Sequence, residues 1–130
     1  MTEKELIQTA VKMLDMAYVP YSHFPVGAAL ECDDGTVYTG CNIENAAFGP
    51  TICAERTAVA KAVSEGHRDF VRIVVAGRSK DFCVPCGVCR QVLREFAPNM
   101  EVICLNGAGE EQVFTLPELL PHSFGPEYLA

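Results

Sequence analysis

The sequence lacks an excess of basic residues. Among its 130 residues, 10 are Lys or Arg and 17 are Asp or Glu, which gives a formal net charge of −7. Nucleic-acid-binding proteins usually carry a basic face that neutralises phosphates. The acidic balance therefore weighs against a polyanion as the main partner, and we expect no nucleic-acid partner.

Long apolar segments are also missing. The longest, such as residues 71–77, are far shorter than the roughly 20 residues of a membrane helix, so we expect no membrane contact. The N-terminal segment has neither the basic start nor the apolar block of a signal peptide. Internal repeats and low-complexity tracts are absent as well. With 49% apolar and 21% charged residues, the composition predicts one globular domain over residues 1–130, located in the cytoplasm.

Cysteine is abundant by contrast, with seven in the chain. An odd number without a secretory signal disfavours a disulfide framework, and clustered cysteines in a reducing compartment are more often metal ligands or catalytic thiols. Cys32, Cys41 and Cys104 lie in strand-like segments, where we expect them to be buried structural residues. Cys83 could begin an iron–sulfur motif with Cys86 and Cys89, but the further Cys and Pro that such a run needs are missing.

Hydrophobic periodicity and turn residues predict the order of the elements. Helices are expected over about residues 2–17, 53–65 and 86–96, and a short one after residue 115. Strands are expected over residues 26–32, 37–41, 71–77, 101–105 and 112–114. Capping boxes from Thr2 to Glu5 and from Thr115 to Glu118 mark the starts of the first and last helices. This αββαβαββα order predicts an α/β fold with three layers, α/β/α, around a mixed five-stranded sheet.

Three cysteines have the spacing of a metal site. Cys86 and Cys89 form a Cys-x-x-Cys pair at a predicted helix start, and Cys53 begins another predicted helix. Exposed backbone N–H groups at helix starts favour anionic sulfur. Three protein ligands with one open position are typical of a catalytic zinc site. A redox Cys-x-x-Cys is an alternative for Cys86 and Cys89, and a structural zinc module with a fourth protein ligand is another.

Glu55 follows the first of these cysteines by two residues. At a helix start this spacing can put its carboxylate beside the open metal position, where it can transfer protons. Three thiolates leave a zinc centre with a net negative charge, and we hypothesise that Arg56 offsets this charge by donating to the thiolates. Phe24 and Phe48 lie on loops bounded by Pro and Gly, and the sequence leaves open whether each serves the core or a binding site. The three His residues show no metal-like spacing.

The sequence resembles the small homotetrameric type of cytidine deaminase over nearly its whole length. The Cys-Ala-Glu and Pro-Cys-x-x-Cys segments also match the signature of zinc deaminases, with Cys in place of the first His. The segments that carry the resemblance are 16–22, 24–30, 40–46, 53–58, 85–91 and 118–121.

The resemblance implies a function and a set of site residues. It implies one zinc ion per subunit held by Cys53, Cys86 and Cys89, with Glu55 as the proton shuttle. It implies hydrolysis of cytidine and deoxycytidine to uridine and deoxyuridine plus ammonia, in pyrimidine salvage, by a homotetramer whose active sites are shared between subunits. The remaining implied residues are Asn42 and Glu44 at the ribose, Asn45, Ala46 and Phe48 in the loop around the sugar, Phe24 on the pyrimidine, the Ala54 backbone at the base edge, the Val84 carbonyl facing ammonia, and Phe124 reaching a neighbouring subunit's site.

Two other deaminase functions compete with this one. A deaminase acting on polynucleotides would need a basic track for flanking nucleotides, which the acidic composition disfavours. A deaminase for another cytosine-containing nucleoside, such as blasticidin S, is also compatible with the zinc motifs. The segment Asn42-Ile43-Glu44-Asn45 favours ordinary cytidine.

Overall fold

Five strands form one mixed sheet in the computed structural model, which describes residues 1–130. The sheet order is β2-β1-β3-β4-β5, and only the central pair β3–β4 is parallel. The elements are α1 (Glu3–Lys12), a 3₁₀ helix (Met13–Met16), β1 (Val26–Cys32), β2 (Val37–Cys41), α2 (Ala54–Ser64), β3 (Phe70–Gly77), α3 (Gly87–Phe96), β4 (Glu101–Leu105), β5 (Glu111–Thr115), α4 (Leu116–Leu119) and a final 3₁₀ turn (Pro126–Tyr128).

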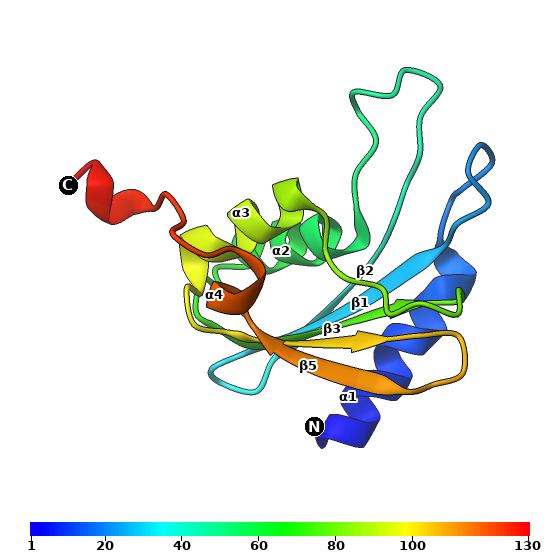
Figure 1. The fold of residues 1–130 in the computed structure, drawn as a ribbon, viewed down its shortest axis with the longest axis horizontal. Coiled ribbons are helices and arrows are strands. Elements are labelled where there is room, and N and C mark those ends of the chain that lie inside the picture. The colour runs from blue at the N-terminus through cyan, green and yellow to red at the C-terminus, as the bar shows by residue number, and fades with distance from the viewer.

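Helices cover both faces of the sheet, so the chain has three layers (Figure 1). On one face, α1 packs Leu6 and Ala10 against inward-facing residues of β3 and β4, including Val74 and Ile103. On the other face, α2 and α3 cover a larger apolar core that includes Leu93. The predicted α/β/α fold with a mixed five-stranded sheet is therefore confirmed. None of the helices has the length and apolarity needed to cross a bilayer.

The end of the first helix differs from the predicted one. The first helix was expected to continue to residue 17, but it ends at Lys12 and tightens into a 3₁₀ turn up to Met16. Ala17 is already extended, with φ −60° and ψ 138°. The Tyr18-Val19-Pro20 segment follows directly. A residue before proline is disfavoured in the helical region, so the helix cannot continue through Val19. Both capping boxes are present.

Two glycines allow the helices to lie directly on the sheet. A Cβ at Gly27 on β1 would collide with the Ala10 carbonyl of α1, and one at Gly40 on β2 would collide with the Ala54 carbonyl of α2. The Gly40 contact matters for function because Ala54 is the first residue of α2. The absence of a side chain at Gly40 therefore sets where α2 begins.

The cysteines in strands are only partly as expected. Cys32 and Cys104 are buried, as predicted, whereas Cys41 at the end of β2 is half-buried. Cys41 lies where β2 leaves the sheet, and its thiol lies 3.5 Å from the Met16 carbonyl instead of pointing into a core. All seven cysteines are free.

Candidate active site

Two helix starts bring three thiols together. Cys53 is the N-cap of α2, Cys86 is the N-cap of α3, and Cys89 lies in the first turn of α3. Their sulfur atoms all lie within 4.8 Å of one another, and Cys53 Sγ is 3.7 Å from Cys86 Sγ. Neither cysteine N-cap makes a side-chain capping bond. The thiols are therefore free to face a shared ligand.

The cluster fits one zinc ion. Three thiolates bound tetrahedrally to zinc at about 2.3 Å lie about 3.8 Å apart, close to the separation seen here. Thiolate sulfur is also a preferred zinc ligand. No fourth His, Cys, Asp or Glu joins the cluster, so the side chains supply three ligands, as in a catalytic site, and not the four of a structural module.

Glu55 lies one residue inside α2, with only 3% of its surface exposed, and it lines the same cavity as Cys53 and Cys86. Burial is the largest influence on this carboxyl group and raises its pKa to about 7. Desolvation penalises the charged form of a carboxylate, so the group exchanges protons more readily near neutral pH. Its position and burial suit a group that accepts and releases a proton.

Arg56 contacts the thiol cluster. Its Nη2 donates to Cys53 Sγ over 3.5 Å. Hydrogen bonding from the Cys89 thiol, and then from Arg56, lowers the pKa of Cys53 to about 5, although burial opposes this shift. The Arg56 Nε is buried and has no hydrogen-bond partner. The guanidinium is thus placed to offset the negative charge of the thiolates.

Two of the three thiols, those of Cys53 and Cys86, line a small cavity of about 140 Å³, called here the metal cavity. Of the residues predicted for the site, this cavity brings together Phe24, Asn42, Cys53, Ala54, Glu55 and Cys86, and it is also lined by Val26, Cys83 and Val84. The walls are mostly apolar around a few polar groups, the usual composition of a small-molecule site.

Asn42 also holds the wall of this cavity in place. Its Oδ1 accepts from the Val26 N–H over 2.9 Å, and its Nδ2 donates to the Phe24 carbonyl over 2.8 Å. A side-chain amide has two lone pairs and two N–H groups, so each end keeps one free position for a ligand.

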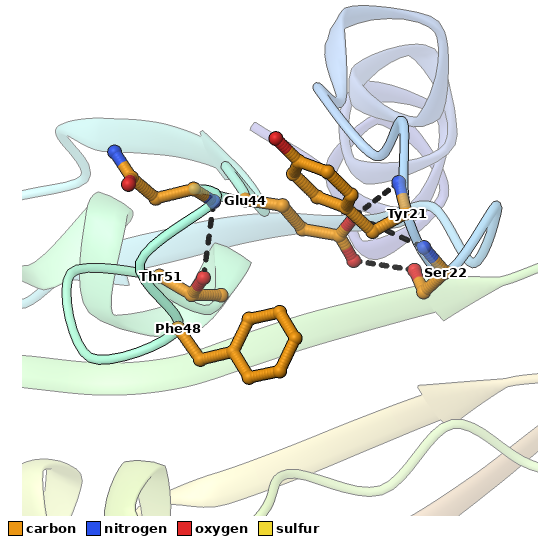
Figure 2. A pocket seen from close by; sticks show the side chains of 6 residues that line it. Tyr21, Ser22, Glu44, Phe48 and Thr51 are labelled. Carbon is orange, nitrogen blue, oxygen red and sulfur yellow. Dashed lines mark hydrogen bonds between the residues drawn. The ribbon is translucent and has the colours of Figure 1, made fainter.

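A second cavity of about 420 Å³ lies between the loop before β1 and the loop after β2. It is lined by Tyr21, Ser22, Glu44, Asn45, Phe48 and Thr51, as Figure 2 shows. The predicted sugar-binding residues are therefore divided, with Asn42 at the metal cavity and Glu44, Asn45 and Phe48 at the second one. Phe48 is 80% exposed in the single chain.

Four predicted residues line neither cavity, namely Cys89 and Arg56 at the thiol cluster, and Ala46 and Phe124. Ala46 lies exposed in the loop after β2. Phe124 is 55% exposed and stacks on Tyr128 at a centroid distance of 5.1 Å in the C-terminal segment, which extends away from the sheet in Figure 1.

The sequence did not single out several residues that line the cavities. Val26 and Cys83 line the metal cavity, and Tyr21, Ser22 and Thr51 line the second one. In the sequence, Val26 has the pattern of an ordinary strand residue. Cys83 there suggests only an iron–sulfur motif, because its spacing to Cys86 is the same as that between Cys86 and Cys89. Ser22 pairs with a residue 22 positions away, and periodicity cannot reveal a contact over that distance.

Comparison with known proteins decides the family. The model for the cytidine and deoxycytidylate deaminase zinc-binding region matches residues 1–105. The chain belongs to this deaminase family. The resemblance predicted from its sequence is confirmed, and the Cys53, Cys86 and Cys89 cluster fits the one zinc ion expected per chain.

Relatives of this deaminase match over their full length. A cytidine deaminase from Sporosarcina psychrophila is 48% identical over 131 residues, covering 100% of this chain and 96% of that protein. A cytidine deaminase from Halalkalibacterium halodurans is 50% identical over 128 residues, covering 98% and 97%. The crystal structure of cytidine deaminase from Burkholderia pseudomallei superposes with a TM-score of 0.92 at 45% identity, covering 95% of this chain and 100% of that one.

Proposed function

We propose that this deaminase hydrolyses cytidine and deoxycytidine to uridine and deoxyuridine with release of ammonia, acting as a single domain. The observation that carries the proposal is the buried Glu55 carboxylate, which shares a cavity with two members of a three-thiol cluster. The identity of about half the residues to cytidine deaminases over their full length supports cytidine as the substrate.

The chain's own residues account for binding of the metal and for proton transfer. Cys53, Cys86 and Cys89 would hold zinc, which supplies Lewis-acid activation of water when it is bound. Glu55 takes one proton from the attacking water and passes it to N3 of the base; it then takes the second proton, from the hydroxyl now on C4, and passes it to the leaving amino group. One water is consumed and one ammonia leaves, so Glu55 returns to its starting state.

The cavity walls provide the groups for the nucleoside. Phe24 offers a ring face to the pyrimidine, and the Ala54 backbone and the Val84 carbonyl lie at the metal cavity for the base edge and the leaving ammonia. Asn42 and Glu44 bind the ribose, with Asn45, Ala46 and Phe48 completing the loop around it. No Lys or Arg lines either cavity, which favours an uncharged nucleoside over a phosphorylated or polymeric substrate.

The protein works as a homotetramer in the cytoplasm, in pyrimidine salvage. The exposed and stacked rings of Phe124 and Tyr128 on the C-terminal segment support the assembly, because contiguous exposed apolar surface marks contact sites. In the tetramer, Phe124 of one subunit completes the active site of a neighbour.

Turnover of four substrates tests the proposal. The zinc-loaded enzyme is mixed in parallel with cytidine, deoxycytidine, blasticidin S and single-stranded DNA, and deamination is followed by ultraviolet absorbance or by sequencing. We expect turnover of the two nucleosides, much slower turnover of blasticidin S, and no editing of DNA. A zinc-loaded enzyme that is inactive on both nucleosides would refute the proposal.

A further inference from the structure

We propose that Ser22 is a positioning residue. Its hydroxyl fixes the Glu44 carboxylate relative to the Phe24 backbone, so that the groups assigned to the sugar and to the base are placed for the same substrate molecule. The inference rests on the proposed function, because Glu44 and Phe24 are assigned there to the ribose and the pyrimidine. Ser22 itself need not touch the substrate.

The contacts around Glu44 carry this inference. One carboxylate oxygen accepts from the Tyr21 and Ser22 backbone N–H groups, over 3.0 Å and 3.1 Å, and the other accepts from the Ser22 hydroxyl. Figure 2 shows the Glu44 side chain pointing at these three donors across the second cavity. Three bonds from two adjacent residues fix the carboxylate in one orientation, with one of its about four lone-pair positions left for a further donor.

The Ser22 hydroxyl has a second partner. While it donates to Glu44, its oxygen accepts from the Phe24 N–H over 3.0 Å. One hydroxyl group therefore links the residue assigned to the sugar with the residue assigned to the base. The loops that carry them are joined nearby as well, since the Tyr18 and Glu44 backbones are hydrogen-bonded over 2.9 Å.

The Ser22 hydroxyl is the main group that stabilises the negative charge of Glu44. Glu44 forms no salt bridge, its three hydrogen-bond donors are neutral, and the charge of nearby His23 is the smallest of the influences that lower its pKa. The hydrogen bond from the Ser22 side chain is the largest cause of the lowered pKa of Glu44. Without it, the carboxylate keeps only the two backbone donors on one oxygen and can rotate away from the site.

A double-mutant cycle tests the link between Ser22 and Glu44. The constants kcat and KM for cytidine are measured for wild type, Ser22→Ala, Glu44→Ala and the double variant. We expect Ser22→Ala to raise KM about tenfold with kcat changed less than about twofold. When Glu44 is already Ala, the same change should cost only about twofold to threefold in kcat/KM, because only the bond to the Phe24 N–H is then lost. Ser22→Thr, which keeps the hydroxyl, restores most of the affinity. Ser64→Ala, which removes a hydroxyl that bonds the Lys61 carbonyl far from the loop, leaves KM unchanged.

Titration of the Glu44 carboxyl group by NMR gives a readout that does not depend on turnover. In Ser22→Ala the pKa of Glu44 rises towards its ordinary value, and in Ser64→Ala it does not move. An equal loss of kcat/KM in both Glu44 backgrounds, or an unchanged pKa of Glu44 in Ser22→Ala, would overturn the inference. Inactivity of the wild type on cytidine would instead refute the proposed function, and the NMR titration would still decide whether Ser22 holds Glu44.

Discussion

Single side chains around the thiol cluster set its charge. Glu55 is kept out of water, and Arg56 directs its guanidinium at Cys53. Three thiolates bound to a divalent metal leave one net negative charge, which weakens the metal as a Lewis acid. Residues that hydrogen-bond to metal ligands commonly tune both affinity and reactivity. We propose that the charge balance of the centre depends on Arg56.

Replacing Arg56 with Gln should therefore weaken zinc retention. Loss of a partner to a metal ligand costs about 10–100-fold in metal affinity, so we expect zinc to transfer to a chelator at least about tenfold more readily. Competition with a chromogenic chelator measures this directly. Arg68→Gln serves as the control, because Arg68 is exposed and remote from the cluster. Equal zinc retention in the two variants would rule out the role of Arg56.

Whole elements place the ligands. Cys53 and Cys86 are N-caps of α2 and α3, so the position of each helix on the sheet fixes the position of its thiol. Arg90 on α3 reinforces this by donating to the Pro85 carbonyl, beside Cys86, and to the Leu119 carbonyl, both over 2.7 Å. On the β2 side, Gly40 lets the first turn of α2 lie against the strand.

Gly40→Ala should displace the first turn of α2. Its new methyl group would collide with backbone atoms of Ala54 and Ala58, which cannot rotate away as a side chain could. Such overpacking typically costs about 1–3 kcal/mol. We expect a lower melting temperature and reduced zinc content, measured by calorimetry and metal analysis. Gly49→Ala, where nothing lies within 4 Å of the new methyl group, should change neither quantity.

The β1–β2 hairpin should show a pH-dependent contribution to stability. Asp34 accepts from the Thr36 N–H and pairs with His67, which also bonds the Tyr38 hydroxyl. The Thr36 backbone bond, foremost, lowers the pKa of Asp34 from 3.8 to about 2. A lowered carboxyl pKa stabilises the fold above the unfolded value, and this contribution is lost as pH falls through the folded value.

Comparison of wild type with Asp34→Asn checks this contribution. The wild type should melt at a higher temperature than the variant at pH 5 to 7, and the difference should shrink as pH falls from about 4 towards 2. Thermal melts followed by circular dichroism supply the measurement. A difference that stays constant over this range would contradict the assignment to the Asp34 charge.

Most elements could be predicted from the sequence because local signals marked them. The Thr2 and Thr115 capping boxes fixed two helix starts, and alternation or apolar runs marked the strands. The 3₁₀ turn at Met13–Met16 and the half-buried Cys41 were not predicted. Both depend on how the chain leaves one element for the next, which periodicity does not encode.

At the scale of the whole molecule, two segments project from the three-layer body. The loop after β2 carries Phe48, and the C-terminal segment carries Phe124 (Figure 1). The C-terminal segment is held by α3, where Gln91 Nε2 donates to the Phe124 carbonyl over 2.9 Å, and Arg94 bonds Ser123 and Glu127. The helix that supplies Cys89 therefore also orients the segment that we propose reaches a neighbour.

Arg94→Ala should release this segment while leaving the metal site in place. We expect unchanged zinc content, KM for cytidine raised several-fold, and a tetramer that dissociates at higher protein concentration than the wild type. Light scattering coupled to size exclusion and steady-state kinetics measure these quantities. Arg68→Ala is the matched control. An unchanged KM and an unchanged assembly would contradict a role for the tail at a neighbouring site.

The metal centre could be predicted from the sequence, and the arrangement of the substrate residues could not. Cys53, Cys86 and Cys89 lie at helix starts, which the local sequence marks, and the motif spacing joins them before the fold is known. Glu44 and Phe48 line a different cavity from Asn42, because the loop that carries them projects from the three-layer body after β2 (Figure 1). Closure of a long loop is set by its tertiary contacts, such as the bonds from Ser22 to Glu44.

The most direct test of the central claim measures the zinc content and the cytidine turnover of Glu55→Gln and of the wild type. Glu65→Gln is the control, because Glu65 is exposed and lies at the end of α2. The account predicts about one zinc per chain in all three proteins and normal turnover in Glu65→Gln. It predicts turnover reduced at least about a hundredfold in Glu55→Gln, as expected for loss of a general acid–base group. A zinc-loaded Glu55→Gln variant that deaminates cytidine at a rate near that of the wild type would contradict the account.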